Sequence, residues 1–437
     1  MYKSKLNQAS KNYTYSLLIA MMASILFVAC DDQRVETVTW TEYEPVYMSQ
    51  EEFLEAVKLE GARDLESPGK IYFYEGYLFV NEVNKGVHII DNRDPSSPLF
   101  TGFISIPANR DIAVRGNLLY ADSHKNLLVF DIENLHDPVL VTRIENVFEF
   151  TLSSQAGFPF RQVDHTRGIV VDWEPVEVEE VCEGNCSQAS RGTWGMPTIA
   201  FENTRALSSF SSGPGAAPSS GTGGSMARFA VSGEYLYAVD DRNLITFDIQ
   251  NPEPVHNGSK NVGWAIETIF PYENSLFVGS AAAMYIYDIS NPETPSHIST
   301  YWHATACDPV VVEGDVAFVT LRQSEMCPWG VNRLEVIDVK DLSNPYKMAF
   351  YDMINPHGLG IDDGRLFVSE GKHGLKIMDA SDPKNVKELR HIKDIETYDV
   401  IPFNNVLMVT GESGIIQYDY SDIHDLQHLS TIPVIKP

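Results

Sequence analysis

Cationic residues are scarce in this sequence. Its 32 Lys and Arg stand against 60 Asp and Glu, which gives a formal net charge of -28 at pH 7. A charge of that sign repels phosphate backbones and anionic lipid surfaces, so we expect no nucleic-acid partner. Motifs for a nucleophile elbow, a phosphate-binding loop or a zinc-protease helix are also missing from the sequence. No catalytic residue can therefore be assigned from a motif.

Long apolar runs are missing after Cys30, and the run before it is short. Leu17 to Ala29 spans thirteen residues, whereas a membrane-spanning helix needs about 20. Lysines precede this run and Cys30 follows it directly. This layout is typical of a bacterial lipoprotein signal peptide over residues 1–29, with Cys30 as the lipidated residue, and an ordinary secretory signal is the alternative. We expect acyl chains to be the only attachment to a membrane.

Two acidic residues, Asp31 and Asp32, follow Cys30. They resemble the export tag on surface lipoproteins of Bacteroidetes-type bacteria. The resemblance implies an outer-membrane lipoprotein exposed on the cell surface, and a protein facing the periplasm is the alternative.

Residues 30–68 are predicted to form a tether with one short strand and one helix. The stretch up to Glu44 is polar, and Val46–Met48 is the expected strand. Ser49 and Glu52 have the spacing of a capping box, so a helix is predicted to begin there and to end near residue 59.

Cysteine is rare after Cys30. The remaining four residues are Cys182, Cys186, Cys307 and Cys327. These four cysteines can pair in three ways. We expect two local disulfides, one between Cys182 and Cys186 and one between Cys307 and Cys327. Such bonds fit an oxidising compartment. A zinc site is the alternative, although the two pairs lie in separate segments, which disfavours it.

One sequence unit recurs along most of the chain. In residues 364–383, the apolar runs Leu366–Val368 and Leu375–Met378 flank a glycine-containing loop, and the second run ends in Asp379. This pattern predicts a β-hairpin that is stable only when stacked against its own copies. The closing aspartate recurs at seven positions, most of them about 40 residues apart: Asp91, Asp131, Asp248, Asp288, Asp338, Asp379 and Asp419. Because a proline-containing turn follows most copies, each aspartate is predicted to form an Asx-turn rather than a catalytic or calcium site.

A period near 40 with strands throughout and no helical periodicity predicts an all-β fold. The expected architecture is a seven-bladed β-propeller over residues 69–437, with four strands in each blade. In blade 6 the strands are predicted at His357–Ile361, Leu366–Ser369, Leu375–Met378 and Val386–His391. Either the C-terminal tail or the Val46–Met48 strand is expected to close the ring.

The runs that end in these aspartates resemble the LVIVD repeat. Residues 334–339 read Leu-Glu-Val-Ile-Asp-Val, residues 375–380 read Leu-Lys-Ile-Met-Asp-Ala, and residues 284–289 read Met-Tyr-Ile-Tyr-Asp-Ile. The resemblance extends from about residue 70 to residue 437, less one insertion. It implies a bacterial or archaeal extracytoplasmic propeller with no assigned reaction.

Two spacings between the aspartates exceed one blade. Between Asp131 and Asp248 the excess falls in residues 148–225, which are predicted to form a large loop insertion between blades 2 and 3. Within it, residues 208–225 are rich in Gly, Ser, Ala and Pro and are expected to be flexible. Gly168–Trp173 and Val176–Val181 could pair as an extra hairpin. A smaller excess lies in blade 5, at residues 325–332.

Both insertions belong to loops that emerge on one face of a propeller, which we call the loop face. Aromatic and imidazole side chains collect there. The binding-face candidates are Trp194, Trp264, Trp302, Trp329, His124, His303 and His373. The channel-mouth candidates, at the starts of inner strands, are Asp111, Glu267, Asp308, His357 and Asp399. A structural role is the alternative for all of them, with polar groups solvating a water-filled channel and indoles covering loop edges.

Three function classes fit these observations. We favour a non-enzymatic binding or scaffold propeller of the cell envelope that presents its loop face to a protein or glycan, because aromatic loop residues suit such contacts. The alternative is a metal-dependent hydrolase or lactonase-like enzyme with its site at the channel mouth. A quinoprotein-like oxidoreductase is the further alternative. No cofactor is predicted for the favoured class, and a divalent metal belongs to the hydrolase alternative.

Overall fold

The computed structural model of the 437-residue chain describes residues 35–149, 151–154, 159–183, 222–223, 225–304, 309–323 and 330–435. The chain divides into two compact units, and each is described by itself. One comprises Met1–Glu42 with Val176–Met196, and the other comprises Tyr43–Pro175 with Pro197–Pro437. No helix among the described residues is long and apolar enough to cross a membrane.

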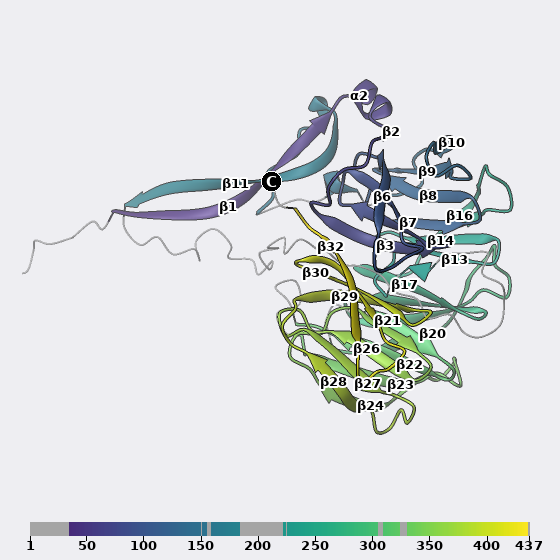
Figure 1. Cartoon of the computed structure of the whole chain (residues 1–437). Coiled ribbons are helices and arrows are strands. Elements are labelled where there is room, and N and C mark those ends of the chain that lie inside the picture. Colours follow the sequence, from purple (N-terminus) through teal and green to yellow (C-terminus); the bar gives the residue numbers. More distant parts are fainter. Residues whose placement is uncertain are drawn as a thin grey trace, which may run out of the picture. The chain divides into compact units, whose positions relative to one another are not determined.

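The larger unit contains seven antiparallel sheets that follow one another along the chain, and Figure 1 shows them in sequence colours. Blade 1 is built from β3 (Pro68–Tyr74), β4 (Tyr77–Glu82), β5 (Gly86–Asp91) and β6 (Leu99–Ser105). Blade 2 is built from β7 (Ile112–Arg115), β8 (Leu118–Ser123), β9 (Asn126–Asp131) and β10 (Val139–Ile144). Blade 3 is built from β13 (Phe229–Ser232), β14 (Tyr235–Val239), β15 (Asn243–Asp248) and β16 (Val255–Asn261).

The remaining four blades repeat this pattern. Blade 4 is built from β17 (Ile266–Tyr272), β18 (Ser275–Ser280), β19 (Ala283–Asp288) and β20 (Ser296–Trp302). Blade 5 is built from β21 (Val310–Glu313), β22 (Val316–Leu321), β23 (Arg333–Asp338) and β24 (Tyr346–Asp352). Blade 6 is built from β25 (Leu359–Asp362), β26 (Arg365–Ser369), β27 (Leu375–Asp379) and β28 (Lys387–Ile392). Blade 7 is built from β29 (Thr397–Phe403), β30 (Val406–Gly411), β31 (Gly414–Asp419) and β32 (Gln427–Pro433).

The first strands of neighbouring blades contact one another from β3 and β7 through to β25 and β29. A seven-bladed propeller was predicted from the sequence, and the structure confirms it. The four strands predicted for blade 6 agree with β25 to β28 to within two residues at each end.

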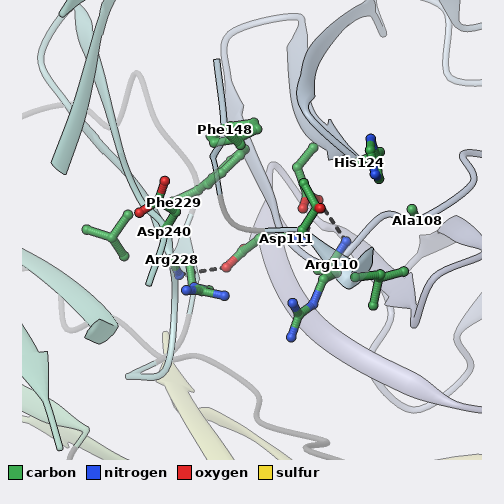
Figure 2. A pocket seen from close by; sticks show the side chains of 12 residues that line it. Ala108, Arg110, Asp111, His124, Phe148, Arg228, Phe229 and Asp240 are labelled. Carbon is green, nitrogen blue, oxygen red and sulfur yellow. Dashed lines mark hydrogen bonds between the residues drawn. The ribbon is translucent and has the colours of Figure 1, made fainter. Parts of the chain in front are cut away.

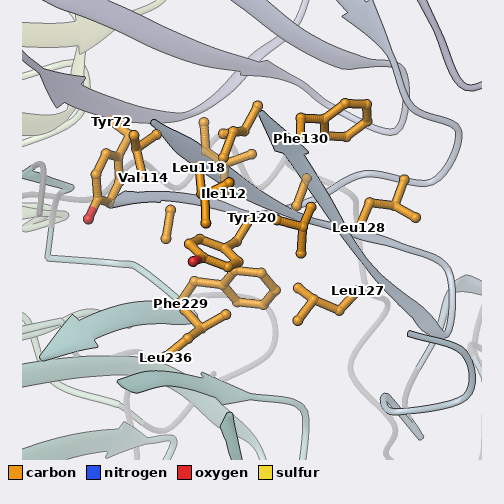
Figure 3. Packing of buried hydrophobic residues seen from close by; sticks show 14 of the residues in the cluster. Tyr72, Ile112, Val114, Leu118, Tyr120, Leu127, Leu128, Phe130, Phe229 and Leu236 are labelled. Carbon is orange, nitrogen blue, oxygen red and sulfur yellow. The ribbon is translucent and has the colours of Figure 1, made fainter. Parts of the chain in front are cut away.

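Apolar runs in the blades are buried on both faces because each blade packs between two others. The four central residues of β23 are all buried. Figure 3 shows one such interface, in which Tyr120 of β8 lies beside Phe229 and Leu236 of blade 3. These residues belong to one core cluster that also includes Tyr72 of blade 1.

The closing aspartates form the predicted Asx-turns in all seven blades. In each, an Asp Oδ1 accepts a hydrogen bond from the backbone N–H two residues later, at 2.8–3.1 Å. The turn directs the chain from the third strand of the blade to the fourth. A catalytic or calcium-binding role is not needed to explain the repetition.

The C-terminal tail closes the ring, as one of the two sequence-based alternatives proposed. Ile435 N donates to Leu65 O at 2.7 Å, and Leu65 and Val434 form a parallel bridge. The buried side-chain amides of Asn92 and Gln417 exchange hydrogen bonds of 2.9 and 2.7 Å between blades 1 and 7.

The region before blade 1 contains more strand and less helix than predicted. The segment predicted as a polar tether is part of β1 (Val35–Met48), because its β-branched and aromatic residues pair with β11 (Ile169–Glu183). The capping box of Ser49 and Glu52 is confirmed, but helix α2 is only Gln50–Glu55. Instead of extending the helix, Lys58–Glu60 form β2 and pair with β6.

Two predictions within the insertion are wrong. The expected hairpin at residues 168–181 is one continuous strand, β11, because no turn residue interrupts the sequence and Pro175 is tolerated in a strand at a sheet edge. The flexible segment does not extend to Ser225, which is buried, and Thr222–Gly223 form β12 on the inner edge of blade 1. Residues 208–221 lie outside the described residues.

Candidate functional site

One residue of each blade occupies the same position of the repeat, near the start of the first strand, and we call these seven positions the channel mouth. This residue lies seven positions before the second strand of its blade. In blade order the seven residues are Lys70, Asp111, Arg228, Thr268, Pro309, Gly358 and Asp399. Two of them, Asp111 and Asp399, were predicted as channel-mouth residues, and both are buried.

Lys70 in blade 1 lies between the two carboxylates of the neighbouring blades, Asp111 in blade 2 and Asp399 in blade 7. Burial lowers the pKa of Lys70 to about 8, although both carboxylates act in the opposite direction. Burial raises the pKa of Asp111 to about 6 and that of Asp399 well above its usual range. The channel mouth therefore holds three ionisable groups whose charged forms are poorly solvated.

These groups hold the chain's own segment that leads into blade 3. Lys70 Nζ donates to Met226 O, and Ser225 Oγ donates to Asp399 Oδ1 at 3.2 Å. Ser225 Oγ also accepts from Leu359 N of blade 6 at 3.1 Å. Residues 222–223 and 225–228, which we call the crossing segment, thus contact blades 1, 2, 6 and 7. Within it, Thr222–Gly223 pair with β3 at the inner edge of blade 1.

Gly358 makes room for the carboxylate of Asp399. A Cβ at residue 358 would overlap the Oδ1 and Cγ atoms of Asp399. The absence of a side chain at this position of blade 6 therefore allows Asp399 to lie beside Ser225.

A second arrangement of carboxylates lies next to the channel mouth and positions two arginines. Asp122 Oδ1 accepts from the backbone N–H of Arg110 at 2.7 Å and from that of Asp111 at 2.8 Å. Asp111 Oδ2 accepts from the backbone N–H of Arg228 at 2.6 Å. Figure 2 shows two of these hydrogen bonds as dashed lines, one at Arg110 and one between Asp111 and Arg228.

The two arginines line a cavity of about 30 Å³ between blades 2 and 3, which we call the arginine pocket. Its apolar wall includes Phe148 and Phe229, whose rings stack with centroids 5.7 Å apart. His124, a predicted binding-face residue, also lines the pocket. Burial lowers the pKa of His124 to about 4, so its ring is neutral at pH 7.

The exposed indoles of Trp264 and Trp302 lie on either side of one turn in blade 4. Trp264 is 59% exposed and Trp302 is 69% exposed. Ala281 N donates to Ala265 O at 3.1 Å, and His303 N donates to Ala282 O at 3.2 Å. Loop segments next to both tryptophans therefore contact the same turn, residues 280–283, whose small side chains leave the indoles prominent.

The other predicted site residues are dispersed. His373 accepts from His391 Nε2 through its carbonyl, at 2.6 Å. His357 Nε2 lies 3.1 Å from Asn355 Nδ2, and burial lowers the pKa of His357 to about 3. Glu267 lies at an irregularity in the pairing of β17 with β18. Cys30, Cys186, Trp194, Cys307, Asp308, Cys327 and Trp329 lie outside the described residues, and Cys182 falls within β11.

Among the described residues, no group of three His, Cys, Asp or Glu side chains could hold a metal ion. The predicted ring at the channel mouth is thus only partly assembled: Asp111 and Asp399 come together around Lys70, whereas Glu267 and His357 belong to other contacts.

Sequence reasoning missed Lys70, Arg110, Asp122, Ser225 and Arg228. Lys70 and Arg228 could have been found, because they occupy the same position of the repeat as Asp111 and Asp399. No repeat position marks Ser225, since it lies in the insertion.

Comparison with known proteins supports the repeat assignment. The family model described as "LVIVD repeat" matches residues 69–104, 108–145, 223–256 and 268–302. The chain therefore contains four LVIVD repeats, in blades 1 to 4. No curated protein sequence matches the chain.

The solved structures to which the chain is similar are distant in sequence. The computationally designed Ika8 protein is 9% identical, with 87% of this chain and 92% of that chain covered and a TM-score of 0.48. BamB from Moraxella catarrhalis is 8% identical, with 88% and 96% covered and a TM-score of 0.46. PorZ, a surface component of the type-IX secretion system of Porphyromonas gingivalis, is 10% identical, with 86% and 39% covered and a TM-score of 0.45.

Proposed function

We propose that this LVIVD-repeat propeller is a binding module of the bacterial cell envelope that holds a protein or glycan partner against its loop face. The observation that carries the proposal is the pair of exposed indoles, Trp264 and Trp302, on the loops around one turn of blade 4. Large apolar side chains are costly to leave in water. Tryptophan is also the residue type most enriched among the dominant contacts of binding interfaces.

The small side chains between the indoles suit a flat partner. Ala281 and Ala283 are buried in the turn between the two tryptophans, so their methyl groups do not project beyond the indoles. Aromatic rings on a low surface provide stacking area for a sugar face or for an apolar side chain of a protein.

The contacts of the channel mouth favour binding over catalysis at that position. Asp111, Asp399 and Lys70 each form a hydrogen bond with the crossing segment. A hydrolase with its site at the channel mouth would need such groups to face a substrate. Here they stabilise the fold beneath the loop face.

Attachment to the envelope is the second part of the proposal. The signal layout before Cys30 supports a lipid anchor. Radiolabelled fatty acid should enter the wild-type protein and should be absent from Cys30→Ala. An unlabelled wild type would remove the anchor from the proposal without affecting the binding module.

Capture of partners from detergent-solubilised cell envelopes, together with a glycan array, tests the binding module. Trp264→Ala and Trp302→Ala should each weaken capture by about 30-fold, which corresponds to a hot-spot loss of about 2 kcal/mol. Leu99→Ala is the matched control, because Leu99 is 61% exposed but begins β6 on the opposite side of its blade from the loop face. Capture that is equal for the wild type and both tryptophan variants would contradict the proposal.

A further inference from the structure

The arginine pocket gathers polar groups that lack partners. Arg228 Nε and His124 Nε2 are both buried, and neither has a hydrogen-bond partner. Among the described residues, no hydrogen bond or ion pair involves the guanidinium of Arg110. The guanidinium of Arg228 makes one long contact, 3.4 Å from Nη2 to Ile266 O. Buried polar atoms without partners are rare in native proteins, and a bound ion or water is one common explanation for them.

The carboxylates of the pocket do not satisfy these donors because they are used elsewhere. Asp122 accepts from two backbone N–H groups and from Asn109 Nδ2. Asp240 accepts from the backbone N–H groups of Arg242 and Asn243, at 2.9 and 2.8 Å. Asp122 Oδ1 and Asp240 Oδ1 are thus occupied, and neither carboxylate forms an ion pair with Arg110 or Arg228 among the described residues.

Two carboxylates of the pocket, Asp122 and Asp111, fix the two arginines next to each other. Asp122 binds the backbone of Arg110, and Asp111 binds the backbone of Arg228. The charge of Arg228 is close enough to add to the effect of burial, which together lower the pKa of Arg110 to about 10. The charges of Asp122 and Asp111 act on the pKa of Arg110 in the opposite direction, but neither carboxylate forms an ion pair with it among the described residues. An oxyanion between the two guanidinium groups would reduce their mutual repulsion.

We propose that the arginine pocket is an oxyanion subsite that binds a carboxylate or phosphate group of the ligand held on the loop face. Guanidinium groups bind both kinds of oxyanion through paired N–H donors. The site is unusual in a chain with 60 acidic residues against 32 basic ones, because the surrounding field would otherwise repel anions.

The size and position of the pocket limit which chemical groups it can bind. A cavity of about 30 Å³ has room for about two water molecules or for one small charged group, but not for a whole sugar ring. Arg110, His124 and Arg228 are partly exposed, so the pocket can be reached from solvent. The guanidinium of Arg228 donates to Ile266 O, two residues after Trp264, so the subsite borders the strand that follows the Trp264 loop. The inference rests on the proposed binding function, because the rest of the ligand would be held on the loop face.

Isothermal titration of the purified chain with small anions tests the subsite without the unknown partner. The probes are inorganic phosphate, acetate and glucuronate at constant ionic strength, with methyl glucoside as the neutral control. We expect saturable binding of at least one anion with a Kd of about 1 mM or tighter and none of methyl glucoside. Binding of phosphate alone assigns a phosphate group, and binding of acetate and glucuronate assigns a carboxylate.

Arg110→Gln and Arg228→Gln should each weaken anion binding at least tenfold. Arg242→Gln is the matched control, because Arg242 lies in the same blade, is 68% exposed and pairs with Asp241. Near-ultraviolet circular dichroism checks that the variants are folded. A wild type that binds none of the three anions would overturn the subsite, as would an equal loss in Arg242→Gln. Because the tryptophan variants are tested by partner capture, failure of the proposed function would be distinguishable from failure of the subsite.

Discussion

Asp111 and Arg228 are separated by 117 residues, and the carboxylate of the first accepts a hydrogen bond of 2.6 Å from the backbone N–H of the second. This contact joins the start of the inner strand of blade 2 to the start of the inner strand of blade 3. It also links the channel mouth to the arginine pocket, since Asp111 lies beside Lys70 on one side and Arg228 lines the pocket on the other. One carboxylate therefore serves both the closure of the fold and the orientation of a binding residue.

The protonation of Asp111 should be visible in the pH dependence of stability. Burial raises its pKa to about 6, whereas the unfolded chain has the ordinary value of about 4. The stability that this group contributes is fully present below about pH 4 and is lost as the pH rises through about 6. From pH 4 to pH 7, the unfolding free energy of the wild type relative to Asp111→Asn should fall by on the order of 3 kcal/mol.

Urea titrations at several pH values measure this difference. Asp379→Asn provides a control of opposite sign, because hydrogen bonds from Ser381 lower the pKa of Asp379. The stability that Asp379 contributes is present above its unfolded pKa and is lost as the pH falls through its folded pKa. If the difference in unfolding free energy between the wild type and Asp111→Asn does not change with pH, the prediction is contradicted.

Gly358→Ala should destabilise the propeller by about 1–3 kcal/mol, the usual cost of overpacking. The new Cβ would overlap the carboxylate of Asp399. Gly61→Ala is the matched control and should change the unfolding free energy little, since nothing lies within 4 Å of its Cβ position. If the overlap is the cause, Asp399→Ala, which removes the overlapping Oδ1 and Cγ atoms, combined with Gly358→Ala will cost less than the sum of the two single changes. Strict additivity would show that the two sites are independent.

Ser225→Ala should cost about 1–3 kcal/mol of unfolding free energy, because it leaves buried groups without a partner. The variant lacks the acceptor for Leu359 N and the donor to Asp399. Ser97→Ala, at an exposed turn, should have little effect. Hydrogen exchange at the amide of Leu359 gives a local measurement, and its rate should rise in Ser225→Ala only. An unchanged rate would mean that the crossing segment does not protect blade 6.

Local sequence patterns predicted the blades because each blade is determined by neighbouring residues. The apolar runs, the closing aspartates and the spacing near 40 residues all act within one hairpin or one turn, so β25 to β28 and the seven Asx-turns could be located from the sequence. The capping box of Ser49 was predictable for the same reason, whereas the end of α2 depends on the pairing of β2 with β6.

The site was less predictable because its contacts join distant parts of the chain. Ser225 binds Asp399, 174 residues later, and Lys70 binds Met226, 156 residues later. No local periodicity encodes such pairs. The repeat register indicates which residues form the channel mouth, but not that the crossing segment contacts them. Asp111 and Asp399 were therefore named from the sequence, but their hydrogen bonds to the crossing segment were not predicted.

The contacts that close the ring affect where unfolding can begin. They are the hydrogen bonds between Asn92 and Gln417 and between Ile435 and Leu65. In an open array of repeats the terminal units have one neighbour each and fray first. In this ring blades 1 and 7 are neighbours, so every blade is held on both sides and none is an end. Removing any one blade breaks two interfaces at once. Unfolding should therefore be cooperative around the ring, and the loops on its rim can move while the blades beneath them remain fixed.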